Sequence, residues 1–235
     1  MELDLEEQEQ VANLKAFWQD YGRWISIGLL IAIVGYGCYW AYSWYQSNQS
    51  LKAGFVYEQL VQDLLKNNLP EVLAKSKNIQ DQYPKTAYAG MAGLMASNLA
   101  YSVADKDSAI QQLEWVALHA KSEGFQSIAK LRLVTILLDQ KTPESFAKAD
   151  KLLNGSMAVG FVALQMERRG DWYWAQDKTE EAKKSYLQAW NVLSEERLKA
   201  TGSKEIDPML KKLQQQNPAS DQRLLKVKIE SLGGF

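Results

Sequence analysis

Residues 24–45 read WISIGLLIAIVGYGCYWAYSWY, an apolar stretch that holds no charged side chain. The hydrocarbon core of a bilayer is about 30 Å thick, and about 20 helical residues cross it. Aromatic residues mark both ends of the stretch, with Trp24 at its start and Trp44 and Tyr45 at its close. Because such rings prefer the headgroup level of a bilayer, the pattern predicts a transmembrane helix over residues 24–45.

A cleaved signal peptide is the alternative interpretation of this stretch, since Ala41-Tyr42-Ser43 resembles a small-x-small cleavage site. The apolar run, however, is longer than the apolar region of about 7–15 residues in a typical signal peptide. The residues before it are acidic rather than basic, and bulky Trp44 and Tyr45 follow the site. We therefore predict an uncleaved anchor.

Basic residues near the span indicate its orientation. Lys15 and Arg23 precede the span, whereas only Lys52 follows it within a comparable distance. Lys and Arg in short flanking segments are enriched on the cytoplasmic side of membrane proteins. The count predicts that residues 1–23 lie in the cytoplasm and that residues 46–235 form a domain on the other side of the membrane.

Three small residues of the span, Gly28, Ala32 and Gly35, share one helix face because they stand four and three residues apart. Small side chains allow a second transmembrane helix to approach closely. We expect this face to contact a partner helix. The alternative is that glycine is simply frequent in membrane helices.

The segment before the span has the pattern of an amphipathic helix. Its apolar residues recur at helical spacing: Val11, Leu14, Phe17, Trp18 and Tyr21. Such a helix can lie on the headgroup surface of the lipid bilayer. Its acidic beginning disfavours anionic lipid, so docking on a protein partner and an ordinary juxtamembrane helix remain alternatives.

Composition excludes several functional classes. The chain has 27 basic and 28 acidic residues, and this balance gives no sign of nucleic-acid binding. Cys38 and His119 are its only cysteine and histidine, too few for most metal sites and for Cys–His nucleophiles. His119 falls near the end of a predicted helix, where a protonated ring suits the helix dipole. We expect no catalytic residue, no cofactor and no metal.

After the span, helical patterns alternate with short polar breaks and predict an all-α domain. The expected helices cover about residues 51–66, 70–82, 86–103, 107–120, 128–138, 143–153, 161–175 and 179–193. Aligned breaks give helix pairs a period of about 34–38 residues, typical of tetratricopeptide-type repeats. Stacked pairs of this kind form an α-solenoid with a concave groove. An irregular domain of four helix pairs fits the pattern equally well.

One of the breaks between helices contains a capping signal. Thr142 is predicted to cap a helix that has Pro143 in its first turn.

Residues 195–221 contain Gly, Pro and a glutamine run, which indicate a loop or a short unattached helix. Apolar residues in 224–232 permit either a helix or a strand, and we favour a helix that caps the last repeat.

The sequence ERRGDWYW over residues 167–174 is the most concentrated recognition candidate. Arginine and tryptophan are enriched at binding hot spots, so Arg168, Arg169 and Trp172 form a candidate recognition patch. In the packing alternative, Trp172 and Trp174 pack between repeats while the arginines pair with nearby carboxylates.

The whole arrangement resembles the YfgM-like family, the ancillary subunits of the SecYEG translocon. The resemblance rests on EQEQVANLKAFWQDYGRWISIG at the start, SIAKLRLVTILLDQ in the middle and LLKVKIESLGG at the end. It covers nearly the whole chain through soft patterns of helix type and order. Residues 198–219 make a longer segment than the family pattern has.

The resemblance implies a bacterial inner-membrane protein with a cytoplasmic N-terminus and a periplasmic helical domain. It also implies association with SecYEG, with the membrane-anchored prolyl isomerase PpiD and with newly exported unfolded chains. The leading hypothesis is thus a non-enzymatic scaffold or chaperone accessory at the translocon. A tethered adaptor of a division or cell-wall complex is the second hypothesis, and a hydrolase that uses His119 is the third.

Overall fold

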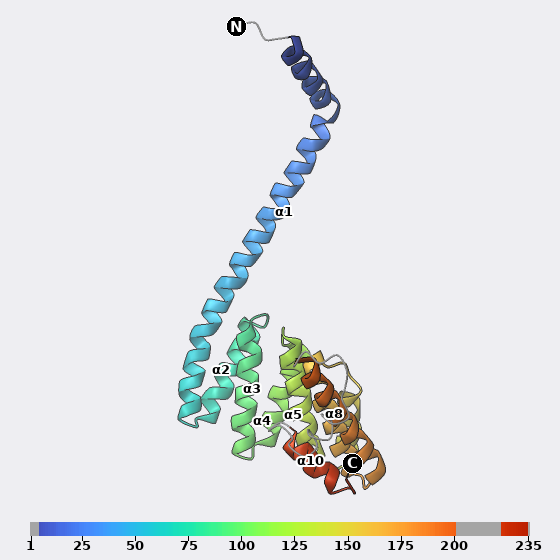
Figure 1. Ribbon diagram of the computed structural model, residues 1–235. Coiled ribbons are helices and arrows are strands. Elements are labelled where there is room, and N and C mark those ends of the chain that lie inside the picture. The colour runs from blue at the N-terminus through green and yellow to red at the C-terminus, as the bar shows by residue number, and fades with distance from the viewer. Residues whose placement is uncertain (1–4, 201–221, 235) are drawn as a thin grey trace. The chain divides into compact units, whose positions relative to one another are not determined.

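The computed structural model describes residues 5–200 and 222–234, and these residues contain only helices and their connections (Figure 1). The chain divides into two compact units, Met1–Leu51 and Lys52–Phe235. The all-α fold class is therefore confirmed for the described residues. The expected loop or short helix in residues 195–221 lies mostly outside them.

The first helix, α1 (Leu5–Leu65), is continuous over 61 residues. It joins the amphipathic segment before the span to the span itself, and it continues through residues 46–50 into the helix expected over about 51–66. The polar residues 46–50 contain neither glycine nor proline, so nothing in them stops a helix. Side-chain hydrogen bonds one turn apart also support it, from Gln46 to Tyr42 (3.0 Å) and from Gln49 to Tyr45 (2.6 Å).

In the second unit, the end of α1 pairs with the next helix and further helix pairs follow. The elements are α2 (Leu69–Gln82), α3 (Ala87–Ser102), α4 (Lys106–His119), α5 (Glu123–Gln140), α6 (Pro143–Leu153), the 3-10 turn η1 (Val159–Phe161), α7 (Val162–Trp174), α8 (Thr179–Ala200) and α10 (Arg223–Glu230). The last is the helix favoured for the C-terminal apolar segment. The predicted helix pairs are present at their predicted places.

The turn between the two helices of each pair has the same backbone feature, which recurs at a regular spacing along the chain. Among the described residues, four that are not glycine have left-handed backbone angles: Asn67, Ala104, Lys141 and Asp177. They stand 37, 37 and 36 residues apart, one in each turn between the two helices of a pair. A left-handed residue after a helix allows the chain to reverse within a few residues. This spacing confirms the predicted period.

Side-chain caps start several of these helices. Asp105 accepts a hydrogen bond from the backbone N–H of Ser108 at the start of α4. Thr142 and Ser145 form a reciprocal capping box at the start of α6, where Pro143 occupies the first turn. The predicted cap at Thr142 is confirmed, and it satisfies N–H groups that a helix leaves without partners.

The core of the second unit consists of three buried clusters along the stack. One joins the end of α1 to α2 and α3, a second joins α3 to α6, and a third joins α8 to α10. Ser76, Gln80 and Gln112 form a buried hydrogen-bonded network between α2 and α4. The Ser76 hydroxyl and the Gln80 side-chain amide each donate to the side-chain oxygen Oε1 of Gln112, both at 2.8 Å. Its donors are satisfied internally, so the network fixes the helix register without leaving buried polar groups unpaired.

Candidate interaction surfaces

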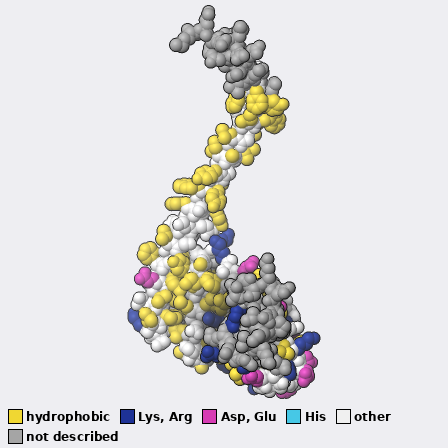
Figure 2. All heavy atoms as spheres, viewed as in Figure 1, with side chains coloured by type: hydrophobic (Ala, Val, Ile, Leu, Met, Phe, Trp, Pro, Cys, Tyr) yellow, Lys and Arg dark blue, Asp and Glu magenta, His cyan; other side chains and the backbone are white. Residues whose placement is uncertain are grey.

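The first candidate surface is the apolar part of α1. Within the described residues, one helical stretch, residues 21–65, is long and apolar enough to cross a membrane, and none of its most apolar window is buried by the protein. Hydrophobic side chains cover this part of the helix in Figure 2. Leu29, Ile31 and Tyr36 are each more than 60% exposed. An exposed apolar surface of this length requires lipid or apolar protein around it.

Gly28, Ala32 and Gly35 are all exposed on this helix. A Cβ built on Gly28 or Gly35 would meet no atom within 4 Å, so the face is open to a neighbouring helix. Its contact with a partner helix stays a prediction. Cys38, the single cysteine, is also exposed there.

The second candidate surface is built by the first helices of successive pairs, and we call it the first-helix face. α5 packs against both α3 and α7. A cavity of about 200 Å³ between α3 and α5 is lined by Tyr101, Arg132 and Thr135 among others. A cavity of about 630 Å³ between α5 and α7 is lined by residues that include Asp139 and Trp174. This face thus combines polar side chains with an aromatic ring that is 52% exposed at Trp174.

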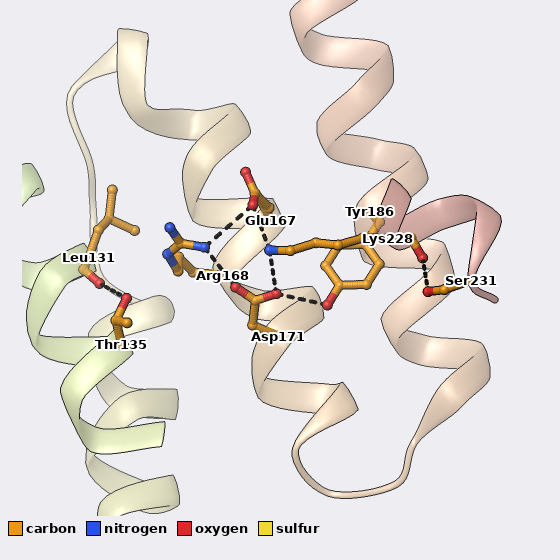
Figure 3. A network of polar contacts seen from close by, with 8 residues as sticks. All are labelled: Leu131, Thr135, Glu167, Arg168, Asp171, Tyr186, Lys228 and Ser231. Carbon is orange, nitrogen blue, oxygen red and sulfur yellow. Dashed lines mark hydrogen bonds and ion pairs between the residues drawn. The ribbon is translucent and has the colours of Figure 1, made fainter. Parts of the chain in front are cut away.

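A polar network joins α7, α8 and α10 beside this face (Figure 3). Lys228 of α10 donates to Glu167 (2.6 Å) and to Asp171 (2.7 Å) of α7. Asp171 also accepts from the Tyr186 hydroxyl of α8 (2.8 Å) and from Arg168 (2.7 Å). Burial, and then the Asp171 carboxylate, raise the pKa of Tyr186 far above its ordinary value. The hydroxyl is protonated at neutral pH and donates to Asp171.

The three residues of the predicted recognition patch all make contacts within the chain. Arg168 pairs with Asp171, and Arg169 reaches Asn154 (2.8 Å) and Asp150 (3.4 Å). The Trp172 indole N–H donates to the Phe146 carbonyl oxygen (2.9 Å) while the ring packs against the core. These are the contacts expected from the packing alternative, and a binding role for the patch stays a prediction.

Trp174 differs from its expected place, because it was expected to pack between repeats and is instead half exposed. No feature of the sequence motif separated Trp174 from Trp172. Helical geometry does so, since two positions along a helix turn a side chain by about 200°. Lys228 was also missed, because it lies 61 residues from Glu167, a distance at which sequence spacing is uninformative.

His119 ends α4 as predicted, and its ring stacks on Trp115 at 5.3 Å with Nδ1 3.1 Å from the Trp115 carbonyl oxygen. The described residues contain no group of three or more His, Cys, Asp or Glu side chains that could hold a metal ion. The surroundings of His119 are those of a helix end.

An exposed apolar helix of membrane-spanning length, continued by stacked helix pairs, defines a class of protein: a membrane-anchored tetratricopeptide-like repeat protein. Comparison with known families agrees, since residues 15–204 match the model of a tetratricopeptide repeat-like domain. No solved structure matches the chain.

Three curated proteins are similar over most of the chain, and each is named an ancillary SecYEG translocon subunit. The protein from Neisseria gonorrhoeae is 34% identical over 80% of this chain and 90% of its own length. Those from Haemophilus influenzae (24% identical over 79% of this chain and 92% of its own length) and Aggregatibacter actinomycetemcomitans (25%, 80% and 91%) are more distant. This chain belongs to the same YfgM-like family of tetratricopeptide-like proteins.

Proposed function

We propose that this protein is an ancillary subunit of the SecYEG translocon, anchored in the bacterial inner membrane. In this proposal the N-terminus is cytoplasmic and the helix-pair domain is periplasmic. The observation that carries it is the exposed apolar helix α1, which ends as the first helix of the repeat domain. An anchor that is continuous with a binding domain holds that domain close to the membrane machinery, where effective concentration strengthens weak contacts.

The role of the domain is that of a non-enzymatic scaffold for exported chains and for the isomerase PpiD. The first-helix face supports this role because it offers cavities with an exposed Trp174, polar side chains and carboxylates. Unfolded segments present backbone amides and scattered apolar side chains, and such a mixed surface suits them. A photo-crosslinker at Trp174 is expected to capture exported chains during secretion, whereas one at exposed Lys184 on α8 serves as the control. Equal capture from both positions would remove the first-helix face from this role.

The translocon contact is tested by photo-crosslinking from the span in living cells. A crosslinker at Ala32, on the small-residue face, is expected to capture a SecYEG component. Val34 is the matched control, because it is equally apolar and exposed (57%) but points about 200° away on the helix. If neither position captures a translocon component while the protein remains in the membrane fraction, the proposal fails. Capture of division or cell-wall components alone would select the adaptor hypothesis.

A further inference from the structure

A third surface lies between α4 and α6, with α5 beneath it. α4 packs on α3 and α5, and α6 packs on α5 and α7, so the side of α5 between them forms the floor of a groove. The groove has a volume of about 500 Å³. Its floor consists of Leu133 and Leu137 of α5 and Ala117 of α4, each less than 10% exposed. Leu152 lines its α6 side. We call this the α4–α6 groove.

This groove is separate from the first-helix face. Thr135 lines the cavities of the first-helix face, whereas Leu133 and Leu137 line the groove. Thr135 stands two residues from each leucine, which is about 200° around an α-helix. The two surfaces therefore lie on opposite sides of α5, and a partner bound at one leaves the other accessible.

The wall of the groove holds an apolar side chain that the chain itself does not cover. Leu118 of α4 lines the groove and is 74% exposed, although it lies in an otherwise well-packed repeat domain. Burial of such a side chain against a ligand is favourable because it removes apolar surface from water. Cavities of about 300–1,000 Å³ with apolar walls are the usual size for specific binding. The groove can therefore accept a few apolar side chains of a ligand.

The rim of the groove is basic. Lys130, Lys148 and Lys151 line it, and Glu114 is the single carboxylate among the lining residues. Within the described part of the chain, none of the three lysines forms an ion pair; Lys130 instead donates to the Ser156 carbonyl oxygen (3.1 Å). Elsewhere in the domain, lysines such as Lys75 and Lys228 do pair with carboxylates. The rim thus has three lysines against one carboxylate, Glu114, among its lining residues.

We propose that the α4–α6 groove binds a peptide segment of a partner protein that carries apolar side chains flanked by carboxylates. The apolar side chains enter the floor and cover Leu118, while the carboxylates meet Lys148 and Lys151 at the rim. Lysine suits this position because its stem packs along apolar surface while its ammonium stays in water. A lipid surface would satisfy the lysines, but a recessed floor between two helices is reached by individual side chains of a peptide. This site is additional to the translocon contact and to the first-helix face.

The test is a binding titration with the full chain in nanodiscs of neutral lipid. The probe is a short fluorescein-labelled peptide in which leucines are flanked by glutamates, followed by fluorescence anisotropy. The double variant Lys148→Glu/Lys151→Glu is expected to raise the dissociation constant by about tenfold or more, because two attractive charges become repulsive. Leu118→Asp is expected to have an effect of similar size through loss of apolar burial.

The matched controls lie on other helices and are also exposed. Lys184→Glu on α8 controls for charge, and Leu224→Asp on α10, where the leucine is 62% exposed, controls for loss of an apolar side chain. Both are expected to bind the probe like the unmodified protein. All five substituted positions are exposed, so thermal unfolding is expected to be unchanged and to confirm that loss of binding is not loss of fold.

Two altered peptides test the two halves of the proposal. Replacement of the glutamates by lysines, or of the leucines by serines, is expected to abolish binding. Equal binding of either altered peptide, or equal binding by the groove and control variants, would overturn the proposal. If phosphatidylglycerol vesicles bind through Lys148 and Lys151 while the peptide does not bind, the groove is a lipid contact and the proposal also fails. These outcomes are independent of crosslinking from the span.

Discussion

At the scale of single residues, the closest approach between the helices of a pair is set by glycine. A Cβ added to Gly170 of α7 would lie 2.3 Å from a ring carbon of Tyr186, a fully packed residue of α8. Gly170→Ala is therefore expected to destabilise the domain by about 1–3 kcal/mol, the usual cost of overpacking. Chemical unfolding of the full chain in detergent, followed by circular dichroism, measures this change.

Gly124 of α5 is the control for this substitution. Its added Cβ would be 3.4 Å from the nearest atom, an ordinary contact, and alanine favours a helix over glycine by up to about 1 kcal/mol. Gly124→Ala is expected to be neutral or stabilising. Equal losses from both substitutions would mean that α7 and α8 do not approach as closely as the structure shows.

Asp105 makes the start of α4 dependent on pH. Hydrogen bonds from Ser108, its side chain first and its backbone N–H second, hold the pKa of Asp105 below its ordinary value. A depressed pKa in the folded state gives stability that is present above about pH 4 and is lost as the pH falls through the folded value. Asp105→Asn keeps a good cap without a titrating group.

The free energy of unfolding of the unmodified protein, minus that of Asp105→Asn, is therefore expected to be constant near neutral pH. Below about pH 4 this difference is expected to fall, because only the unmodified protein loses an ionised cap. Urea unfolding at several pH values measures the difference, and the other carboxylates cancel because both proteins share them. A difference that does not change with pH would mean that the carboxylate at the cap is not stabilised by its ionisation.

Local chemistry decides which of these residues could be predicted from the sequence. The cap at Thr142 with Pro143 follows from neighbours within one turn, and it is confirmed. The partners of Arg168 were predictable only as a type of contact, because Asp171 is near in sequence while Lys228 joins the same network from α10. Contacts between distant elements depend on the packing of the whole domain, which spacing does not encode.

At the scale of elements, α10 stabilises the end of the repeat stack. Leu225 and Ile229 are fully buried in one cluster with Tyr186 and Trp190 of α8, and Lys228 pairs with α7. Leu225→Ala is expected to cost about 2–5 kcal/mol, because a buried leucine is replaced by a cavity. Val227 of the same helix is 60% exposed, so Val227→Ala is the control and is expected to change stability by less than about 0.5 kcal/mol.

Thermal unfolding of both variants checks the role of α10. A small, equal effect of Leu225→Ala and Val227→Ala would show that α10 does not cap the stack. The expected larger loss for Leu225→Ala would also explain why the apolar residues 224–232 are helical: as a helix they place Leu225 and Ile229 on one face, four residues apart.

The elements also show where sequence reasoning succeeds and fails. The breaks at 67–68, 105–107, 139–141 and 176–178 were visible as polar residues. Each of them contains, or directly follows, a residue with left-handed backbone angles. The expected helices end at 45 and begin again at about 51, whereas α1 continues through residues 46–50, because none of these polar residues terminates a helix. Polarity marks exposure to water, whereas glycine, proline and capping residues mark helix ends.

At the scale of the whole molecule, a helix of membrane-spanning length continues into a repeat domain that has two candidate binding surfaces. The period of the repeat predicted the stack of helix pairs, and the family comparison agrees with it. The α4–α6 groove was not predictable, since it arises where α4 and α6 both pack on α5 and leave a space between them. The apolar residues of its floor read in the sequence as ordinary core residues.

Cysteine accessibility measures whether residues 24–45 cross the membrane and whether the repeat domain lies on its outer side, as proposed above. In a Cys38→Ser background, Lys15→Cys and Lys184→Cys are labelled separately with a membrane-impermeant maleimide in intact spheroplasts. We expect Lys184→Cys to be labelled before lysis and Lys15→Cys only after it, with the protein retained in the membrane after alkaline washing. Labelling in the reverse order, or release of the protein into the soluble fraction, would contradict this expectation.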